Sequence, residues 1–258
     1  MKNTKATKPG PQTTAIHGGE PRRHGVNAGV GPDICRTSTF TFASTQQMKE
    51  WAEGKNKAYI YTRYGNPTLS VAEAKIAALE GAEAAVVAAS GMAAISSALL
   101  SALRTGDEVI STAQVYGGTY RLMRDLFPDF GIKVHHVGTD LAGMEELVTP
   151  RTRALYVETP TNPTLRLVDL HKAVAFAQKH KLASIIDNTF ASPVLQNPIA
   201  MGFDMVVHSA TKYLAGHSDV IAGAAAGSKH WMERVRHFVI YLGGSMDPEA
   251  AYLLMRGM

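Results

Sequence analysis

The segment FDMVVHSATKYLAGHSD, Phe203–Asp219, decides the fold prediction for this chain. It begins with an apolar run, Met205–Val207, which has the length of a short buried strand. Two small hydroxyl residues, Ser209 and Thr211, follow the run, and Lys212 comes directly after them. In an open α/β sheet, ligands bind at the carboxyl ends of the strands. The segment therefore predicts that Lys212 lies at the ligand-binding edge of such a sheet.

The chemistry of these side chains indicates a class of ligand. A lysine held among apolar neighbours loses its proton more readily and can attack an aldehyde. The hydroxyl groups of Ser209 and Thr211 can donate hydrogen bonds to a phosphate. Pyridoxal phosphate needs a Schiff-base lysine, a partner for its ring nitrogen and an anion site. Lys212 is therefore a candidate for pyridoxal phosphate attachment, and the alternative is an ordinary surface lysine that follows a strand.

The composition is that of a globular protein with one large or two small domains. The chain has 258 residues, of which 45% are hydrophobic and 19% charged. The net charge is +4, but basic residues are scattered among acidic ones, so we expect no nucleic-acid partner. The polar N-terminus lacks a signal-peptide core, and no apolar run has the length of a membrane span. Because the single cysteine, Cys35, excludes an internal disulfide, we expect a cytoplasmic protein. Because no apolar run could span a membrane, we expect no membrane partner.

From residue 84 onward, segments with a strand pattern alternate with segments with a helix pattern. The predicted strands cover residues 85–88, 107–110, 132–137, 154–157, 182–186, 205–207 and 220–226. The predicted helices cover residues 93–103, 120–127, 144–148, 170–180, 230–242 and 248–258. This alternation predicts an α/β fold with a mostly parallel seven-stranded sheet and helices on both faces.

The first sixty residues have a different character. Residues 1 to about 20 are polar and contain proline and glycine, which predicts a flexible arm. Residues 21–60 are again rich in glycine and end in a helix-like segment, 45–54; we expect residues 1–60 to form an arm that contacts a neighbouring subunit. The next helix is predicted at residues 69–81, with Thr68 or Ser70 as its N-cap.

Five strand ends each carry a group that suits pyridoxal phosphate. They are the Ser90–Met92 turn as an anion site, the Tyr116 ring, the Asn162 amide, the Asp187 carboxylate and Lys212. Asp187 ends the apolar run LASIID, where a carboxylate is costly unless a cation, such as a pyridinium nitrogen, meets it. Each residue alone has a structural alternative, such as a turn, a core aromatic or a loop cap. Together they predict one site, because parallel strands bring their carboxyl ends to one edge.

Other nucleotide and metal sites lack their signatures in this sequence. The glycines of residues 25–31 do not have the G-x-G-x-x-G spacing, and no complete Walker A motif occurs. The pair His135-His136 and the histidines His208 and His217 do not have ligand spacing with carboxylates or thiols. We therefore predict no metal site and take these histidines as structural, although His208 lies close to the predicted cofactor site.

Six motifs occur in a fixed order over residues 37–258: YTRYGNPT, ASGMAAI, VYGGTYRL, VETPTNPT, IIDNTFASP and VVHSATKYLAGHSD. With them the chain resembles the Cys/Met-metabolism family of pyridoxal-phosphate enzymes, which includes cystathionine gamma-synthases, cystathionine gamma-lyases and methionine gamma-lyases. The resemblance implies the large domain of a fold type I PLP-transferase, assigned to residues 61–245. It also implies transsulfuration, by γ-elimination or γ-replacement on sulfur amino acids or O-acylhomoserine.

The same resemblance implies roles for single residues. Lys212 would form the Schiff base with pyridoxal phosphate and later move protons, Asp187 would pair with the pyridinium nitrogen, and Tyr116 would stack on the ring and act as an acid or base. Asn162 would contact the 3-oxygen of the cofactor. The implied phosphate contacts are Gly91, Met92, Ser209 and Thr211, with Tyr61 and Arg63 completing the phosphate site of a neighbouring subunit in a homodimer or homotetramer.

Two features depart from the family pattern. Family members run past residue 258, so we expect residues 246–258 to begin a linker helix to a small C-terminal domain that is missing here and that supplies the arginine for the substrate carboxylate. Second, Gly118 stands where methionine gamma-lyases carry a cysteine, which favours the cystathionine branch. The alternatives are a methionine gamma-lyase or O-acylhomoserine sulfhydrylase, and a cofactor-binding protein without turnover.

Overall fold

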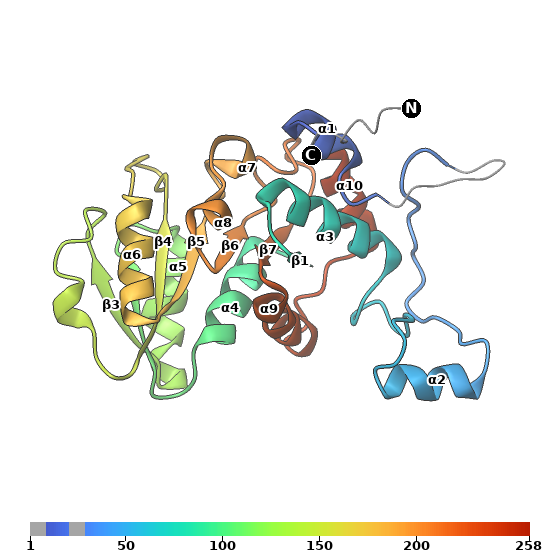
Figure 1. Cartoon of the computed structure of the whole chain (residues 1–258), viewed down its shortest axis with the longest axis horizontal. Coiled ribbons are helices and arrows are strands. Elements are labelled where there is room, and N and C mark those ends of the chain that lie inside the picture. Colours follow the sequence, from blue (N-terminus) through green and yellow to red (C-terminus); the bar gives the residue numbers. More distant parts are fainter. Residues whose placement is uncertain (1–8, 21–28) are drawn as a thin grey trace, which may run out of the picture.

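One seven-stranded sheet runs through the computed structural model, which describes residues 9–20 and 29–258 (Figure 1). The strand order is β1-β7-β6-β5-β4-β2-β3. Strands β3, β2, β4, β5 and β6 run parallel to one another, and β7 is antiparallel to both β6 and β1. The bounds are β1 Ala84–Ala88, β2 Glu108–Thr112, β3 Lys133–Val137, β4 Thr152–Glu158, β5 Ala183–Asp187, β6 Met205–His208 and β7 Gly223–Gly227. All seven predicted strands and the mostly parallel sheet are confirmed.

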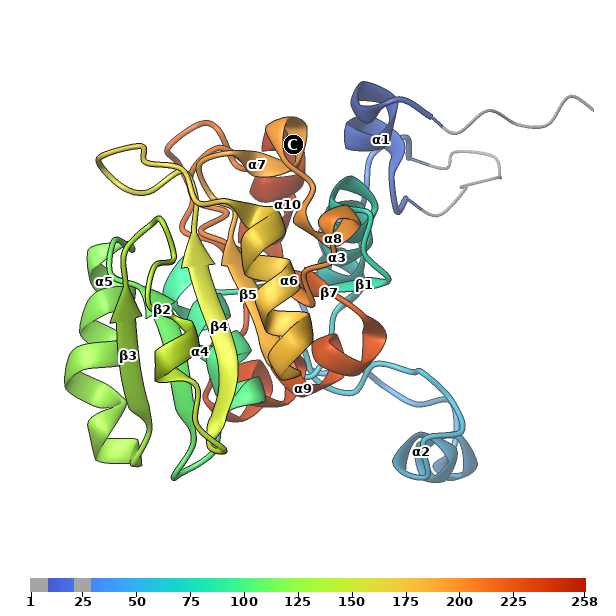
Figure 2. The ribbon, with the colours of Figure 1, turned by 60° about the vertical axis from the view of Figure 1, so that its left-hand side comes forward.

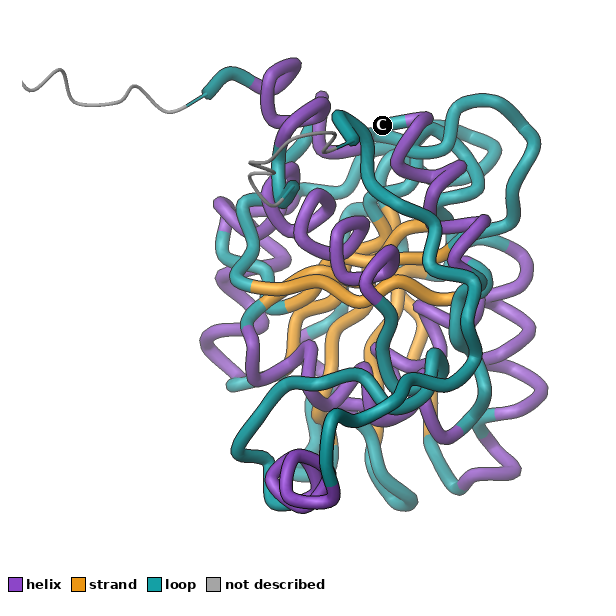
Figure 3. Tube along the Cα trace, turned by 90° about the vertical axis from the view of Figure 1, so that its right-hand side faces the viewer, coloured by secondary structure: helices purple, strands orange, loops and turns teal. Residues whose placement is uncertain are grey.

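Helices cover both faces of this sheet, as its apolar strands require. Helices α4 (Gly91–Ala102) and α9 (Lys229–Tyr241) pack on one face, where Leu99 and Val235 join a core with Tyr156 and Ile185. The other face carries α6 (Leu170–His180), α3 (Pro67–Glu80) and α10 (Pro248–Gly257). Figure 2 shows α6 in front of β4 and β5, and Figure 3 shows the strands between two layers of helices.

The start of α3 differs from the prediction. Its N-cap is Asn66, whose side-chain oxygen accepts a hydrogen bond from the Thr68 backbone N–H at 2.9 Å. Thr68 is not the cap, because its hydroxyl group donates to the Asp33 carbonyl and accepts from the Cys35 backbone N–H. Pro67 at the first helical position favours a start at this point. Thr68 therefore attaches the preceding segment to the body of the fold.

The prediction of a flexible arm is wrong for residues 9–20. This stretch contains α1 (Pro11–His17), which packs against α3. The buried Lys75 ammonium of α3 donates to the carbonyls of Ala15 and Ile16, at 2.9 and 2.6 Å, and forms an ion pair with Glu20. A cation at the end of a helix satisfies carbonyl groups that have no helical partner. Residues 1–8 and 21–28 of the predicted arm lie outside the described residues.

Helix α2 (Thr45–Ala52) confirms the predicted helix at 45–54 and has no buried residue. It lies apart from the sheet in Figure 1. The assignment of residues 1–60 as an arm that contacts a neighbouring subunit stays a prediction. Helix α10 lies where the linker helix is predicted, and in this chain Ala251 and Leu254 bury it against α3.

Several short helical segments complete the chain. Helix α5 (Gly117–Arg121) begins before the predicted helix 120–127 and continues as the π-helix η1 (Leu122–Leu126). The predicted helix at 144–148 is a single 3₁₀ turn, η3 (Glu145–Leu147). Three unpredicted segments are η2 (Pro128–Phe130), α7 (Ser192–Leu195) and α8 (Pro198–Met201). In the part of the chain that the structure describes, no helix is both long and apolar enough to cross a bilayer.

Candidate active site

A cavity of about 370 Å³ lies at the carboxyl ends of β4, β5 and β6, beside the start of α4. Its walls come from segments far apart in the sequence: the start of α4, the loops after β2, β4 and β5, and the segment after β6. Eight predicted site residues line it: Gly91, Met92, Tyr116, Asn162, Asp187, Ser209, Thr211 and Lys212. The parallel sheet therefore gathers these strand ends at one edge, as the sequence predicted.

The start of α4 forms one wall of this cavity. Ser90 caps the helix, because its hydroxyl oxygen accepts a hydrogen bond from the Ala93 backbone N–H at 3.1 Å. A Cβ atom on Gly91 would lie only 2.7 Å from the Ser209 Cβ, so the close approach of α4 to the segment after β6 requires glycine. The first backbone N–H groups of a helix have no helical partner and attract anions. This wall therefore suits a phosphate group.

The two predicted hydroxyl donors differ in their surroundings. The Ser209 hydroxyl forms no hydrogen bond within the described part of the chain, and the Ser209 backbone N–H is fixed by the Thr189 hydroxyl at 2.8 Å. The Thr211 hydroxyl donates to the Ala222 carbonyl at 3.1 Å and accepts from the Ala222 backbone N–H at 2.8 Å. Thr211 lines the cavity, but its proton ties the lysine segment to the chain before β7. An anion would compete with that bond.

Lys212 lies at the mouth of the cavity, in a turn after β6. Its backbone N–H donates to the Ser209 carbonyl at 3.0 Å. The expectation of apolar surroundings is wrong in this chain, because the Lys212 side chain is exposed. The neighbouring Tyr213 and Ile221 are also exposed, 64% and 69%, so the cavity is open on this side. Among the described residues the Lys212 ammonium has no ion-pair or hydrogen-bond partner, and it is accessible to a ligand.

Asp187 is buried at the end of β5, with 4% of its surface exposed. One carboxylate oxygen accepts from the Thr189 backbone N–H at 3.0 Å and from the Thr189 hydroxyl at 2.5 Å. The Tyr156 hydroxyl lies 3.4 Å from the other oxygen. Burial raises the pKa of Asp187, although the hydrogen bonds from Thr189 lower it. A cation placed beside this carboxylate would offset the cost of its burial.

Glu158, which has no predicted role, lies beside Asp187. It ends β4, is 5% exposed, and is the direct neighbour of Asp187 across the parallel strands. Its two oxygens accept backbone N–H bonds from Tyr116, at 2.6 Å, and from Asn162, at 3.1 Å. Burial and the charge of Asp187 raise the pKa of Glu158 to about 7. The same signal that marked Asp187, a carboxylate ending an apolar strand, was present here in LYVE.

The Tyr116 side chain stands at the rim of the cavity and is 47% exposed. A Cβ atom on Gly118 would lie 2.5 Å from the Tyr116 ring, so the absence of a side chain at 118 permits this ring position. Two further predicted residues, Tyr61 and Arg63, do not line the cavity. The Arg63 guanidinium lies over the rings of Tyr64 and Tyr61, at 4.8 and 5.6 Å, and donates to the Ile240 carbonyl at 3.2 Å.

A second buried polar cluster lies on β6 and the end of α3. His208 and Glu80 are both buried, and the His208 Nε2 atom lies 2.6 Å from a Glu80 carboxylate oxygen. Asn188, directly after Asp187, donates to the same oxygen at 3.2 Å. His208 thus lies next to the candidate site, as predicted. Within residues 9–20 and 29–258, no group of histidine, cysteine and acidic side chains could hold a metal ion.

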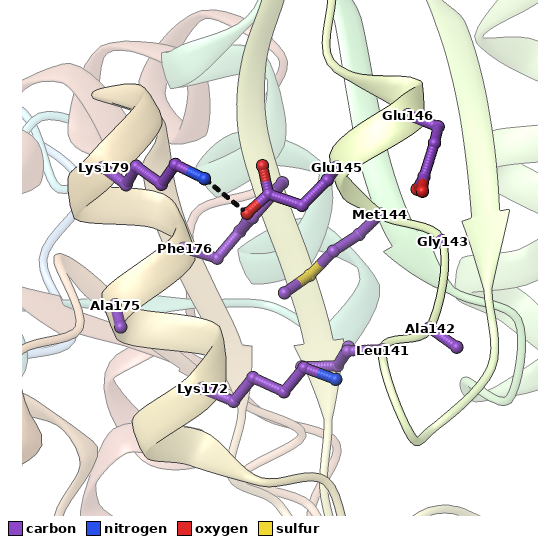
Figure 4. Close-up of a pocket in the computed structure, with 10 residues that line it drawn as sticks. All are labelled: Leu141, Ala142, Gly143, Met144, Glu145, Glu146, Lys172, Ala175, Phe176 and Lys179. Atoms are coloured by element: carbon purple, nitrogen blue, oxygen red, sulfur yellow. Dashed lines mark hydrogen bonds and ion pairs between the residues drawn. The ribbon is translucent and has the colours of Figure 1, made fainter.

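Another cavity, of about 390 Å³, lies between α6 and residues 141–146 (Figure 4). Glu145 points toward Lys179 and forms ion pairs with Lys179, at 2.9 Å, and with His180, at 2.8 Å. The Lys172 ammonium donates to the Asp140 carbonyl at 2.7 Å. Because Glu145, Lys172 and Lys179 already have partners and the cavity contains no predicted site residue, it is not the candidate active site.

The fold and the cavity at the carboxyl edge define an α/β protein of the class that binds a cofactor at the ends of parallel strands. The cavity has buried carboxylates for a cation, a helix start for an anion and an accessible primary amine. This set of groups fits the ring nitrogen, the phosphate and the aldehyde of pyridoxal phosphate.

The chain belongs to the family described as Cys/Met metabolism PLP-dependent enzyme, whose model matches residues 12–258. Pyridoxal phosphate is the cofactor of this family. Comparison with known proteins thus confirms both the resemblance and the cofactor predicted from the motifs.

Relatives within this family carry several names. The chain is 41% identical to L-methionine gamma-lyase from Pseudomonas putida, over 97% of this chain and 63% of the relative. It is 39% identical to cystathionine gamma-synthase 1, chloroplastic, from Arabidopsis thaliana, over 94% of this chain and 44% of the relative. The structure of cystathionine gamma-lyase from Lactobacillus plantarum, complexed with L-serine, superposes with a TM-score of 0.88 at 40% identity, over 96% of this chain and 63% of that one. The chain thus spans less than two thirds of the length of these relatives.

The raised pKa of Glu158 predicts a pH dependence of stability. The folded protein holds this proton up to a pH of about 7, whereas a free glutamate loses it near the ordinary value of 4.5. The contribution of Glu158 to the free energy of unfolding is therefore complete below pH 4.5 and is lost as the pH rises through about 7. Replacement by the neutral Glu158→Gln should remove a loss on the order of 1–3 kcal/mol between about pH 5 and pH 8.

Denaturant unfolding of the cofactor-free chain at both pH values measures this difference. The exposed His136 of β3, whose pKa is lowered by partial desolvation of its ring, contributes in the opposite direction, but it is present in both proteins and cancels. Glu145→Gln is the matched control, because the pKa of the half-exposed Glu145 is lowered and its titration falls below this pH range. An unchanged pH dependence in Glu158→Gln would contradict the raised pKa.

Proposed function

We propose that this chain is the cofactor-binding part of an enzyme that catalyses γ-elimination or γ-replacement on sulfur amino acids or O-acylhomoserine, as cystathionine gamma-synthases and gamma-lyases do. The observation that carries the proposal is the cavity in which buried Asp187, the start of α4 and the exposed Lys212 amine lie together. The family match and the names of the relatives support the reaction class.

We assign the cofactor contacts to residues of this cavity. Lys212 takes the cofactor aldehyde, and Asp187 pairs with the ring nitrogen, which supplies the cation that a buried carboxylate needs. The backbone N–H groups of Gly91 and Met92 and the unpartnered Ser209 hydroxyl take the phosphate, with Thr211 at the border of that site. Asn162 contacts the oxygen side of the ring, and Tyr116 covers the ring face.

The chemistry divides between the cofactor and the chain. When bound, pyridoxal phosphate stabilises the negative charge that develops on the substrate carbon next to the amino group. Lys212 moves the proton of that carbon, since its amine is accessible and lies at the cavity mouth. The Tyr116 hydroxyl is a second acid or base at the rim. Asp187 holds the positive charge on the ring nitrogen, because burial makes an unpaired carboxylate costly.

The partners of the proposed enzyme are a small amino-acid substrate and further copies of the chain in a homodimer or homotetramer. In this arrangement Tyr61 and Arg63 contribute to the phosphate site of a neighbouring copy. Their position outside the chain's own cavity supports this assignment, as does the exposure of Tyr213 and Ile221 beside Lys212. The single cysteine, Cys35, supports a cytoplasmic location, where disulfides are rare.

Two alternatives differ in substrate or in turnover. The first alternative is a methionine gamma-lyase, which the 41% identity to the enzyme from Pseudomonas putida supports, or an O-acylhomoserine sulfhydrylase of the same chemical class. Gly118 beside the Tyr116 ring favours the cystathionine type over the methionine gamma-lyase. Keto acid and thiol released from methionine, but no product from cystathionine, would favour the methionine gamma-lyase. Covalent cofactor attachment without a reaction on any amino acid would identify a binding protein without turnover.

The proposal predicts covalent attachment of pyridoxal phosphate to Lys212. After incubation with the cofactor and borohydride reduction, mass spectrometry should find the added mass on the Lys212 peptide. Lys212→Ala should abolish the adduct, because no other lysine among the described residues lines the cavity. Lys229→Ala, which removes a lysine at the start of α9, is the matched control and should retain it. Equal labelling of wild type and Lys212→Ala would overturn the assignment.

A mixing experiment tests the shared phosphate site. Lys212→Ala chains cannot attach the cofactor, and Arg63→Ala chains should bind it weakly because each lacks the guanidinium that the neighbouring site needs. A mixed dimer contains one complete site, in the Arg63→Ala chain. Tight covalent labelling should therefore appear only after the two variants are unfolded and refolded together. If labelling of the mixture equals the mean of the separate variants, each site is built from a single chain.

A further inference from the structure

Glu158 joins two loops at the rim of the cavity. Its Oε2 atom accepts the Tyr116 backbone N–H at 2.6 Å, and its Oε1 atom accepts the Asn162 backbone N–H at 3.1 Å. Tyr116 lies in the loop after β2, whereas Asn162 lies in the loop after β4. One buried carboxylate therefore connects the backbone of the two residues whose side chains line the cavity from these loops.

Only a carboxylate of this length serves both donors. Each of its oxygens accepts one N–H group, and above the Glu158 pKa of about 7, where the group is ionised, these bonds are stronger than those between neutral groups. A glutamine would offer one oxygen and turn its own N–H group toward the second backbone N–H. An aspartate would be shorter by one methylene group. The buried position is costly for a carboxylate, so the two donors account for its presence.

The Tyr116 ring depends on this backbone bond. Its side chain is 47% exposed, and the helix that it precedes, α5, has only five residues. The ring lies against Gly118, where a Cβ atom would approach it to 2.5 Å. The Tyr116 carbonyl accepts the Tyr120 backbone N–H at 2.9 Å. The position of the ring is thus set by this bond, by the Glu158 bond to the Tyr116 N–H and by the open space at Gly118.

We propose that Glu158 is a positioning residue of this site, which fixes the Tyr116 ring and the Asn162 amide relative to each other and to Asp187 through backbone hydrogen bonds. The inference rests on the proposed cofactor site. Glu158 is also the direct strand neighbour of Asp187, so it sets the distance from the two loops to the carboxylate assigned to the ring nitrogen. Glu158 acts through these groups and not on the substrate.

Amide hydrogen exchange of the cofactor-free chain tests this role directly. In wild type, after correction for intrinsic rates, the amides of Tyr116 and Asn162 should exchange at least about tenfold more slowly than the amide of Gly117, which is the first residue of α5 and has no helical acceptor. This comparison needs no variant, so it tests the hydrogen bonding of the Tyr116 and Asn162 amides even if substitutions impair folding. Equal exchange of the three amides would refute the proposal.

Two variants separate the bonds. In Glu158→Gln one of the two amides should lose about tenfold in protection, and in Glu158→Ala both should. Glu145→Gln, a change of the same chemistry at α6, should leave both amides unchanged. Unchanged exchange of Tyr116 and Asn162 in folded Glu158→Ala would overturn the proposal.

A second readout distinguishes positioning from general stabilisation. At equal covalent occupancy of Lys212, the visible circular dichroism of bound pyridoxal phosphate reports the asymmetry of groups around its ring. It should be weaker in Glu158→Gln than in wild type and unchanged in Glu145→Gln, because Glu158, unlike Glu145, accepts the backbone N–H groups of Tyr116 and Asn162. An identical signal would refute the positioning role. If wild type itself shows no Lys212 adduct, the proposed function fails. The exchange data still test whether Glu158 is hydrogen-bonded to the two loops.

Discussion

The carboxylates of Glu158 and Asp187, buried side by side at the ends of two parallel strands, are the constraint on which the rest of the site depends. A carboxylate removed from water must find donors or a cation, or take up a proton. Asp187 receives two hydrogen bonds from Thr189, and Glu158 receives two from the loops that carry Tyr116 and Asn162. Burial still raises the pKa of both groups, so this part of the cavity favours a positively charged ligand atom.

The parallel sheet turns this pair into a site. Because β2, β4, β5 and β6 run in the same direction, their carboxyl ends meet at one edge. The start of α4 approaches the same edge, where Gly91 leaves room for Ser209. One ligand can thus bind in this cavity with its cationic part beside the two carboxylates and its anionic part at the start of α4. Pyridoxal phosphate, the cofactor of the family to which the chain belongs, has both parts.

The base of the cavity is fixed by hydrogen bonds, and its mouth is exposed to solvent. Asp187 and Glu158 are held by several hydrogen bonds, whereas Lys212, Tyr116 and the nearby Ile221 are exposed. Lys212 is free to react but is not enclosed by apolar side chains of its own chain. In the proposed oligomer a neighbouring copy covers this opening and supplies the phosphate contacts of Tyr61 and Arg63. The exposed apolar residues beside the lysine are consistent with such a cover.

The sequence by itself determined the seven strands, their alternation with helices and the residues that end them. These features follow from apolar runs and periodicity, which are local properties of the chain, and from the rule that parallel strands share a carboxyl edge. For this reason Asp187 and Lys212 could be placed in one site before any contact was known. The motifs added the family, since their order is also a property of the sequence alone.

Only the tertiary structure decided the contacts between distant segments. The Lys75 ammonium donates to a carbonyl of α1, and the N-cap of α3 is Asn66 and not Thr68. The Thr211 hydroxyl donates to the Ala222 carbonyl. The exposure of Lys212 and the two backbone hydrogen bonds that Glu158 accepts belong to the same group of findings. Each depends on which backbone groups meet after folding. Local patterns show that a polar side chain stands at a strand end, but its partner is chosen by the packing of segments far apart in the chain.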